Sequence, residues 1–292
     1  MVKLGFSTPL PVCLLRNGGG PGPSRYPVAM PRLFEHDELD STNEHAFREV
    51  DAGRAEHLDA HLARFQTAGR GRLGRPWVGQ AGEGMLLSIV LLGRDSWSLP
   101  LPAVLSMTVG LALRNAVLAA GLGGDEVLLD WPNDLVVATR PTGERLAAEF
   151  EAPKLAGILV ESRNLDPDAP AYVVGIGANV LQRAFPAELL AERPISSLAL
   201  LGCETTPKEL ANGIVDELQE LLEVGALAPS QILADYLDAT GAAGEQVLVV
   251  LNGGKTARGR ALFLETDGLR IVTAAGETLQ FALEHIQKLQ RI

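Results

Sequence analysis

The chain has 292 residues, of which 47% are hydrophobic, so it is long enough to bury a large core. Its formal net charge of -11 excludes the overall basic character of a general nucleic-acid-binding surface. The two cysteines, Cys13 and Cys203, are too few for a disulfide framework and favour a reducing, cytoplasmic setting. The most apolar long stretch, residues 101–122, is interrupted by polar side chains and is typical of a buried helix, so we expect no membrane span.

The first 30 residues differ from the rest in composition. They contain the glycine- and proline-rich tract Gly18–Pro23 and lack a small-residue cleavage site after an apolar core. We therefore predict a disordered N-terminal extension over 1–30 rather than a signal peptide. Folding is expected to begin near Pro31, and Met30 is a candidate translation start.

The first folded elements predicted are helical. Residues 40–53 combine capping side chains with an acidic first turn, which is typical of a helix start. A second helical stretch is expected to carry His57 and His61, with a strand at 63–66 after it. The two histidines have a spacing that can bind metal. Since neither a third ligand nor a His-Glu-x-x-His pattern accompanies them, a solvated helix face is the stronger interpretation.

The middle of the chain alternates strands and helices. Residues 84–92 form a continuous apolar run that predicts a central strand covered on both faces. A long helix is predicted from Pro102 to Leu122, and a helical stretch over about 207–237 ends the main domain. Shorter elements are predicted as follows: strands at 126–131, 135–137, 155–162 and 171–180, and a surface helix at 140–150.

The pattern of apolar and turn-forming residues changes from about Gly241. Four short apolar runs, separated by Asn-Gly-Gly, Asp-Gly and Ala-Gly-Glu turns, predict a β-meander that closes into a small barrel. The whole pattern predicts an α+β protein divided into an extension (1–30), a main domain (31–240) and a small C-terminal domain (241–292).

One basic loop, QTAGRGRLGRPW (Gln66–Trp77), stands out in this acidic chain. Three arginines alternate with glycines, which let backbone N–H groups converge on an anion while each guanidinium offers a planar fork of donors. Trp77 adds a flat surface on which a ring can stack. Composition alone favours a charged surface turn. The framing residues favour an anion site, and no Gly-Lys-Ser/Thr follows, so the loop is not a P-loop.

Two further segments place polar groups next to predicted strands. In WPNDL, Asn133 and Asp134 follow a proline; such a pair is most often a simple turn, but it can also hold Mg²⁺ beside phosphates. In KLAGILVE, Lys154 precedes a buried strand, where a lysine usually only protects an edge. At the mouth of a pocket it would instead offset the charge that builds between a phosphate and a carboxylate.

The segment GIGANV carries two glycines inside a predicted strand. Gly175 and Gly177 indicate either a bulge or a ligand that approaches the backbone closely. Asn179, which follows them, either reads a purine edge or is hydrogen-bonded within the fold.

Taken in order, DSTN, QTAGRGRLGRPW, WPNDL, KLAGILVE and GIGANV resemble the motifs of the biotin protein ligases. The resemblance runs from about Pro31 to the C-terminus. It implies a class II synthetase-like catalytic domain with a mixed sheet, followed by an SH3-like β-barrel. Two departures stand out: Asp130 occupies a position that is usually basic, and the 19 residues 135–153 replace a tight hairpin.

The resemblance also implies the activity. A ligase of this family forms a carbon–nitrogen bond in two steps: biotin and Mg·ATP give biotinyl-5′-AMP, and a lysine of a biotin carboxyl carrier protein or carrier domain then accepts the biotinyl group. We expect a monofunctional enzyme without an N-terminal DNA-binding domain and with no DNA or membrane partner; a homodimer is a candidate assembly. The alternatives are a lipoate ligase-like enzyme, whose Arg-Arg-x-Ser-Gly-Gly-Gly signature is absent, and a non-catalytic biotin-binding or regulatory protein.

The motifs assign roles to individual residues by position. The biotin-binding set implied is Ser41, Thr42, Asn43, Gln66, Gly69, Arg70, Gly71, Arg72, Lys154, Gly157, Leu159 and Gly175. The nucleotide-binding set is Trp77, Asn133 and Asn179, with Asp134 near Mg²⁺. The catalytic set is Lys154, Arg70, Arg72 and Asp134, with Lys154 as the principal charge-stabilising group.

Overall fold

The computed structural model describes residues 31–77, 79–93, 102–124, 126–138, 151–163 and 170–292. By its internal contacts the chain divides into Met1–Met30 and Pro31–Ile292, and all that follows concerns the second unit. The extension predicted for 1–30 and the surface helix predicted for 140–150 lie outside the described residues.

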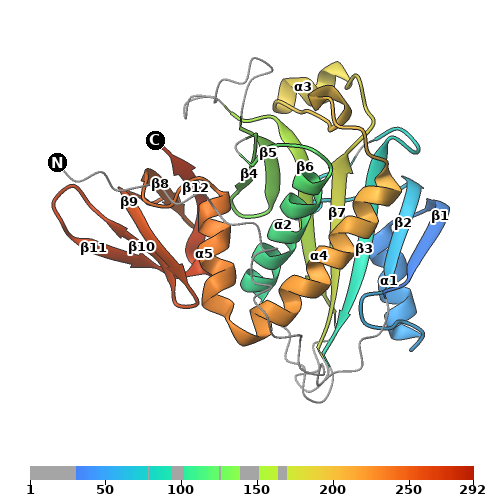
Figure 1. The fold of residues 1–292 in the computed structure, drawn as a ribbon, viewed down its shortest axis with the longest axis horizontal. Helices are drawn as coiled ribbons and strands as arrows, with labels where there is room; N and C mark the ends of the chain where they lie inside the picture. The colour runs from blue at the N-terminus through green and yellow to red at the C-terminus, as the bar shows by residue number, and fades with distance from the viewer. Residues whose placement is uncertain (1–30, 78, 94–101, 125, 139–150, 164–169) are drawn as a thin grey trace, which may run out of the picture. The chain divides into compact units, whose positions relative to one another are not determined.

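A seven-stranded mixed sheet forms the centre of this unit (Figure 1). Its first two strands are parallel and the other neighbours are antiparallel, in the order β1-β2-β3-β7-β6-β5-β4. The strands are β1 (Leu33–Leu39), β2 (Ala60–Gln66), β3 (Gly84–Leu92), β4 (Val127–Asp130), β5 (Asp134–Val137), β6 (Lys154–Ser162) and β7 (Ala171–Asn179). The apolar run predicted as a central strand is confirmed: β3 lies between β2 and β7, and nearly all of its residues are buried.

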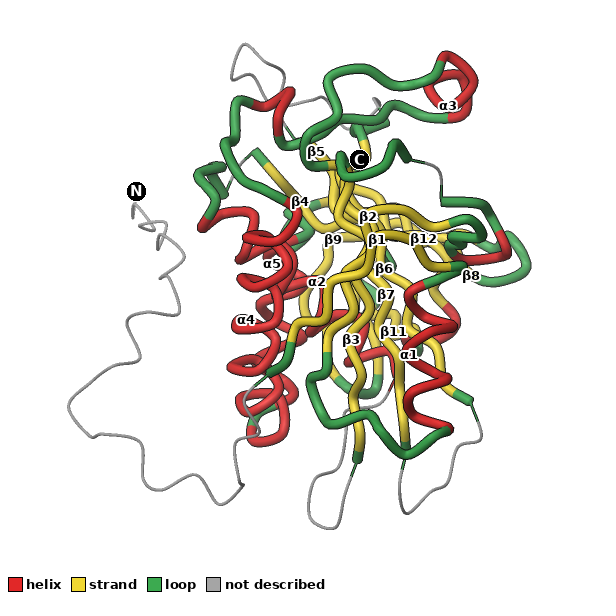
Figure 2. Tube along the Cα trace, turned by 90° about the vertical axis from the view of Figure 1, so that its right-hand side faces the viewer, coloured by secondary structure: helices red, strands yellow, loops and turns green. Residues whose placement is uncertain are grey.

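Helices cover both faces of this sheet (Figure 2). Helix α1 (Thr42–Asp51) packs on one face, and α2 (Pro102–Ala119) and α4 (Pro207–Leu227) pack on the other. The remaining helical segments are α3 (Ala187–Glu192), α5 (Pro229–Ala239) and the short 3₁₀ turns η2 (Arg72–Gly74), η3 (Ala199–Leu201) and η4 (Leu283–His285). The single helical stretch predicted over about 207–237 is two helices, because proline lacks the N–H that a continuing helix needs. No helix in the described part of the chain is long and apolar enough to cross a membrane.

The helix expected around His57 and His61 is wrong. Leu58 adopts a positive φ of 67°, and strand β2 begins at Ala60, so His61 lies on a strand. The reason is burial: the first four residues of β2 are all buried between β1 and β3, so the strand lacks the alternation of polar and apolar residues that would mark it.

The C-terminal segment forms a second, antiparallel sheet of five strands in the order β11-β10-β9-β8-β12. They are β8 (Gln246–Leu251), β9 (Thr256–Glu265), β10 (Gly268–Val272), β11 (Thr278–Phe281) and β12 (Ile286–Arg291). Strand β12 was not predicted, because four of its six residues are polar. Closure into a barrel is not confirmed, since β11 and β12 are the two edges of this fully described sheet.

A buried aromatic pair joins the two sheets. The indole Nε1 of Trp131 donates a hydrogen bond to the carbonyl of Ile286 at 2.9 Å, and its ring lies 5.9 Å from that of Tyr236 in an edge-to-face arrangement. Both side chains are buried in one continuous core. The turn that follows Trp131, which carries Asn133 and Asp134, is therefore fixed to the C-terminal sheet.

Candidate functional site

A cavity of about 840 Å³ opens among α1, the sheet, the segment around α3 and the basic loop Gln66–Trp77, here called the arginine loop. Nearly all the residues that the sequence implied for the site line it: Ser41, Thr42, Asn43, Gln66, Arg70, Gly71, Arg72, Trp77, Asn133, Asp134, Lys154, Gly157, Leu159, Gly175 and Asn179. The exception is Gly69, which is not among the lining residues. A Cβ there would be 2.8 Å from Nε2 of Gln66, so its glycine lets Gln66 pack closely.

Glycines form the floor of the cavity. Gly157 and Gly177 are paired across β6 and β7, and Gly175 lies two residues along β7. A Cβ at these positions would lie 2.8 Å from Nζ of Lys154, 2.4 Å from Cε2 of Trp77 and 2.5 Å from Oδ1 of Asn43 respectively. The glycines of GIGANV thus permit a close approach, here by the protein's own functional side chains.

One wall carries a buried hydrogen-bond network. The backbone N–H and the hydroxyl of Thr42 both donate to Oε1 of Gln66, at 2.7 and 3.0 Å. The hydroxyl of Ser88 lies 2.7 Å from Oγ1 of Thr42 and 2.5 Å from Oδ1 of Asn43, whose amide donates to Glu161 at 2.7 Å. These bonds fix several polar groups along one wall of the cavity, here called the polar wall, and fixed polar groups of this kind orient a small ligand.

Ser88 was missed in the sequence, although a signal was present. It is the one polar residue of the apolar run GMLLSIVLL, and its side chain is fully buried. A buried hydroxyl needs partners, so a lone serine in a central strand indicates a polar feature beside it.

The arginine loop folds back over the cavity. The N–H of Gly71 donates to the carbonyl of Arg75 at 2.7 Å, and the N–H of Trp77 donates to the carbonyl of Gly69 at 2.9 Å. Arg72 donates to Oδ1 of Asn133 at 2.8 Å, across the cavity from the loop. The loop therefore lines the site and is more than a charged surface turn.

Arg70 takes part in an ion-pair cluster at the cavity rim. Its guanidinium and that of Arg163 both contact Glu44, and Arg70 also lies 3.5 Å from Glu161. The hydrogen bond from Arg163 is the main cause of the lowered pKa of Glu44, so this carboxylate stays ionised at neutral pH. The cluster links the loop to α1 and β6.

Lys154 occupies a different position from an edge-protecting lysine. It is only 20% exposed; its ammonium lies 2.7 Å from Oδ1 of Asp134 and 5.6 Å from the centre of the Trp77 ring. The second oxygen of Asp134 accepts from Arg193 at 2.7 Å. Both carboxylate oxygens thus have cationic partners, so Asp134 is the centre of an ion-pair network on the cavity lining.

The two asparagines implied for the nucleotide are fixed by backbone carbonyls. The amide of Asn133 donates to Ile158 at 2.8 Å, and that of Asn179 donates to Ser196 at 3.0 Å. Residues without any sequence signal complete the lining: Phe185, Leu189, Glu192, Arg193 and Ile195 around α3, and Gln287 on β12.

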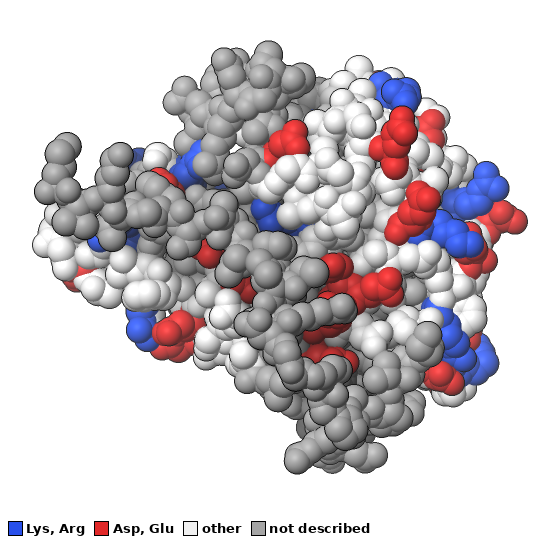
Figure 3. Space-filling model, viewed as in Figure 1, with Lys and Arg blue, Asp and Glu red and all other residues white. Residues whose placement is uncertain are grey.

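Asp130, the departure from the family pattern, is not among the lining residues. Burial, and then the nearby Asp134, raise the pKa of its carboxyl group. On the face drawn in Figure 3, acidic and basic side chains of the described residues lie interspersed, without one large basic patch. The concentrated positive charge of Arg70, Arg72, Lys154 and Arg193 belongs to the cavity itself.

A mixed α/β fold with a cationic, glycine-floored cavity, one polar wall and an indole defines a protein that binds and activates a small anionic ligand. Comparisons with known proteins identify the family. The family model described as "Biotin/lipoate A/B protein ligase family" matches residues 36–179. The chain is 32% identical over 244 residues to the bifunctional ligase/repressor BirA of Escherichia coli (strain K12), covering 79% of this chain and 68% of that protein.

A second relative and a solved structure agree. The biotin–[acetyl-CoA-carboxylase] ligase of Mycobacterium tuberculosis is 31% identical over 230 residues, covering 75% of this chain and 77% of that protein. The fold matches that of a biotin protein ligase from Aquifex aeolicus in complex with biotin and ATP, with a TM-score of 0.66, 24% identity, and coverage of 90% of this chain and 100% of that one. The chain belongs to the biotin protein ligase family, as the motifs predicted.

Proposed function

We propose that this chain is an ATP-dependent biotin protein ligase. It joins biotin to AMP and then transfers the biotinyl group to a lysine of a biotin carboxyl carrier protein or carrier domain. The observation that carries the proposal is the convergence of Arg70, Arg72 and Lys154 with the polar wall in one cavity. A site that brings a carboxylate and a triphosphate together needs this concentration of positive charge.

In the first step, an oxygen of the biotin carboxylate attacks the α-phosphorus of ATP. The bond from that phosphorus to the oxygen of the β-phosphate breaks, and pyrophosphate leaves. The wall of Thr42, Asn43 and Gln66 would orient biotin, while Trp77 would stack on the adenine. Lys154 lines the same cavity with its ammonium 5.6 Å from the centre of the Trp77 ring, and there it would stabilise the charge that builds on the α-phosphate.

The role proposed for Asp134 follows from its ion pairs. Since Lys154 and Arg193 occupy both of its oxygens, we assign it to holding Lys154 in place. Mg²⁺ would enter with the phosphates of ATP, whose charge it offsets, and we assign no protein step to it.

In the second step, the amine of the carrier lysine attacks the carbonyl carbon of biotinyl-AMP. The amine loses a proton, an amide forms and AMP leaves. Until the carrier arrives, the loop from Arg70 to Trp77 would cover the adenylate and keep water away from it. We assign this chemistry to a catalytic domain of residues 31–240, with 241–292 as the counterpart of the SH3-like domain, and we expect a cytoplasmic enzyme.

Exchange of pyrophosphate into ATP tests the proposal, because it reports the first step without a carrier. We expect exchange that depends on biotin and does not occur with lipoate, followed by biotin transfer to an isolated carrier domain. Exchange with lipoate alone would identify a lipoate ligase-like enzyme. Tight binding of biotin without any exchange would identify a non-catalytic binding protein.

A further inference from the structure

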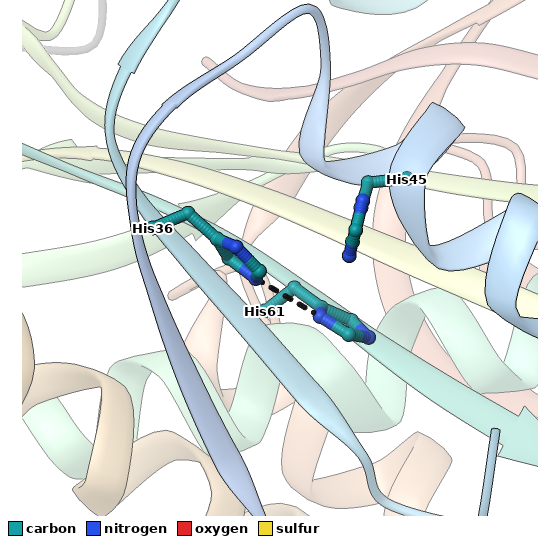
Figure 4. Close-up of side chains that lie close together, drawn as sticks. All are labelled: His36, His45 and His61. Carbon is teal, nitrogen blue, oxygen red and sulfur yellow. Dashed lines mark hydrogen bonds between the residues drawn. The ribbon is translucent and has the colours of Figure 1, made fainter. Parts of the chain in front are cut away.

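Three of the five histidines of the chain meet outside the catalytic cavity. His36 comes from β1, His45 from α1 and His61 from β2, and one ligand atom of each lies within 4.8 Å of those of the other two. Figure 4 shows His45 pointing from its helix towards the pair formed by His36 and His61 on neighbouring strands. None of the three lines the catalytic cavity.

From this geometry we infer that His36, His45 and His61 form a site for a divalent transition metal ion, with Zn²⁺ as the expected ligand. Three imidazole nitrogens from three elements are a common donor set for such ions, and water would take the fourth position. Mg²⁺ and Ca²⁺, which prefer oxygen ligands, would not bind here.

The distances between the rings are close to those of a tetrahedral site. Nε2 of His36 lies 3.2 Å from Nδ1 of His61. Two nitrogens that each lie about 2.0–2.1 Å from a tetrahedral Zn²⁺ are about 3.4 Å apart. The ring centre of His45 lies 4.7 Å from that of His36 and 4.8 Å from that of His61. His45 is partly exposed, so a small rotation of its side chain completes the set of three ligands.

His61 is the second indication that the cluster serves a ligand. It is only 4% exposed, and its Nε2 is buried without a hydrogen-bond partner among the described residues. The contact with His36 uses its other nitrogen, so neither tautomer of the pair satisfies His61 completely. A buried imidazole without full hydrogen bonding costs stability, and Nδ1, the nitrogen of His61 that faces His36, is the atom placed to coordinate an ion.

The surroundings favour neutral imidazoles, the form that binds metal. Burial is the main cause that lowers the pKa of His61 to about 4, and the neighbouring histidines add to it. Burial, then His45, also lowers the pKa of His36. Phe34 stacks on the ring of His61 at 5.2 Å between centroids and holds its plane.

Two carboxylates near the cluster are already bound. Both oxygens of Glu49 accept from Arg54, at 2.8 and 2.7 Å. Both oxygens of Asp59 accept from Arg32, at 2.7 and 2.6 Å. They contribute negative potential that offsets the charge of a cation without acting as its ligands.

Metal binding would connect this edge of the sheet to the catalytic cavity. His45 lies two residues after Asn43, on the helix whose first residues line the cavity. An ion held by β1, β2 and α1 would fix the start of that helix against the sheet. We therefore expect Zn²⁺ to stabilise the fold and the polar wall without taking part in the reaction.

Titration of the full-length, chelator-treated protein tests this inference, by calorimetry with Zn²⁺ and by absorption with Co²⁺. We expect one equivalent of each ion, the strong visible absorption of tetrahedral Co²⁺, a higher Tm with Zn²⁺ and no competition from Mg²⁺. His36→Gln and His45→Gln should each weaken Zn²⁺ binding by at least about 10- to 100-fold, the loss seen even for residues that only support a ligand. Neither residue lines the catalytic cavity, and cooperative thermal unfolding of both metal-free variants checks that they fold.

His285→Gln is the matched control, since His285 is the exposed histidine of η4 on the C-terminal segment. This variant keeps the cluster and both cysteines and should bind Zn²⁺ as the unaltered protein does. The inference is overturned if the unaltered protein binds no stoichiometric Zn²⁺. It is also overturned if the two cluster variants bind as tightly as the unaltered protein, or if His285→Gln loses as much affinity as they do. Because the readout is metal binding, the outcome does not depend on the proposed ligase activity.

Discussion

The indole of Trp77 lies against the backbone of Gly177 so closely that a Cβ at residue 177 would be 2.4 Å from Cε2 of the ring. No side chain can be added at this position unless Trp77 moves. The glycine of β7 thus leaves the space in which the ring of Trp77 packs against the floor of the cavity, which connects a backbone feature of the sheet to the stacking surface proposed for adenine.

Gly177→Ala should therefore displace Trp77 and weaken ATP binding. Loss of one base-stacking contact costs about 1–3 kcal/mol, which is roughly 5- to 150-fold in the KM for ATP. The KM for biotin should change much less, since the polar wall is intact. Steady-state pyrophosphate exchange, with each substrate varied in turn, measures both values.

Gly213→Ala in α4 is the matched control for that change. A Cβ at residue 213 would lie 3.5 Å from the Cβ of Ala116, an ordinary contact. Alanine is favoured over glycine in a helix by about 0.5–1 kcal/mol, so this variant should be as active as the unaltered protein and no less stable. If Gly177→Ala behaves in the same way, Trp77 is not the stacking surface.

Lys154→Ala should slow formation of biotinyl-AMP while leaving biotin affinity nearly unchanged. Removal of one preorganised electrostatic donor typically lowers the rate by roughly 10²- to 10³-fold. Single-turnover release of pyrophosphate at saturating biotin and Mg·ATP measures this rate. Lys154→Arg should restore little, because the ammonium fits into the space left by Gly157, where a planar guanidinium does not.

Lys208→Ala provides the comparison for Lys154→Ala. Lys208 is exposed and pairs with Glu35 at 2.5 Å, away from the lining of the cavity, so its loss should not change the rate. A rate for Lys154→Ala within a few-fold of that of Lys208→Ala would assign the stabilising charge to another cation of the site.

Ser88→Ala should weaken biotin binding, because Oδ1 of Asn43 and Oγ1 of Thr42 lose a partner inside the fold. The two groups, no longer held in place, must be ordered when biotin binds. This costs about 0.5–1.5 kcal/mol for each side chain, which corresponds to a roughly 2- to 13-fold higher Kd for biotin per side chain. Thr108→Val removes an equally buried hydroxyl from α2, outside the cavity, and should leave that Kd unchanged. Equal Kd values for the two variants, measured by calorimetry, would contradict the assignment of the polar wall to biotin.

Local patterns predicted much of this structure. The apolar run of β3 and the glycine-spaced arginines are each a single continuous segment of the chain, so the sequence alone predicts a buried strand and an anion-binding loop. Arg193 was missed because nothing near it in sequence indicates that α3 brings it 2.7 Å from Asp134. The histidine cluster was missed for the same reason: its ligands are contributed by three elements, and its buried strand was taken for a helix.

Asp130→Asn should stabilise the protein at neutral and alkaline pH. Burial raises the pKa of this carboxyl group, and Asp134 raises it further. The positive charges of Lys288 and Arg193 lower it, but by less. A folded-state pKa above the unfolded value means that stability falls as pH rises from the unfolded value through the folded one, because ionisation is costlier in the fold. The amide carries no charge, so the increase in Tm should grow as the pH rises through the raised pKa of the folded state and should disappear near the unfolded pKa of about 3.9. Thermal unfolding of both proteins at several pH values measures the difference. An increase in Tm that is as large at pH 4 as at pH 8 would show that the asparagine acts through packing and not through the buried charge.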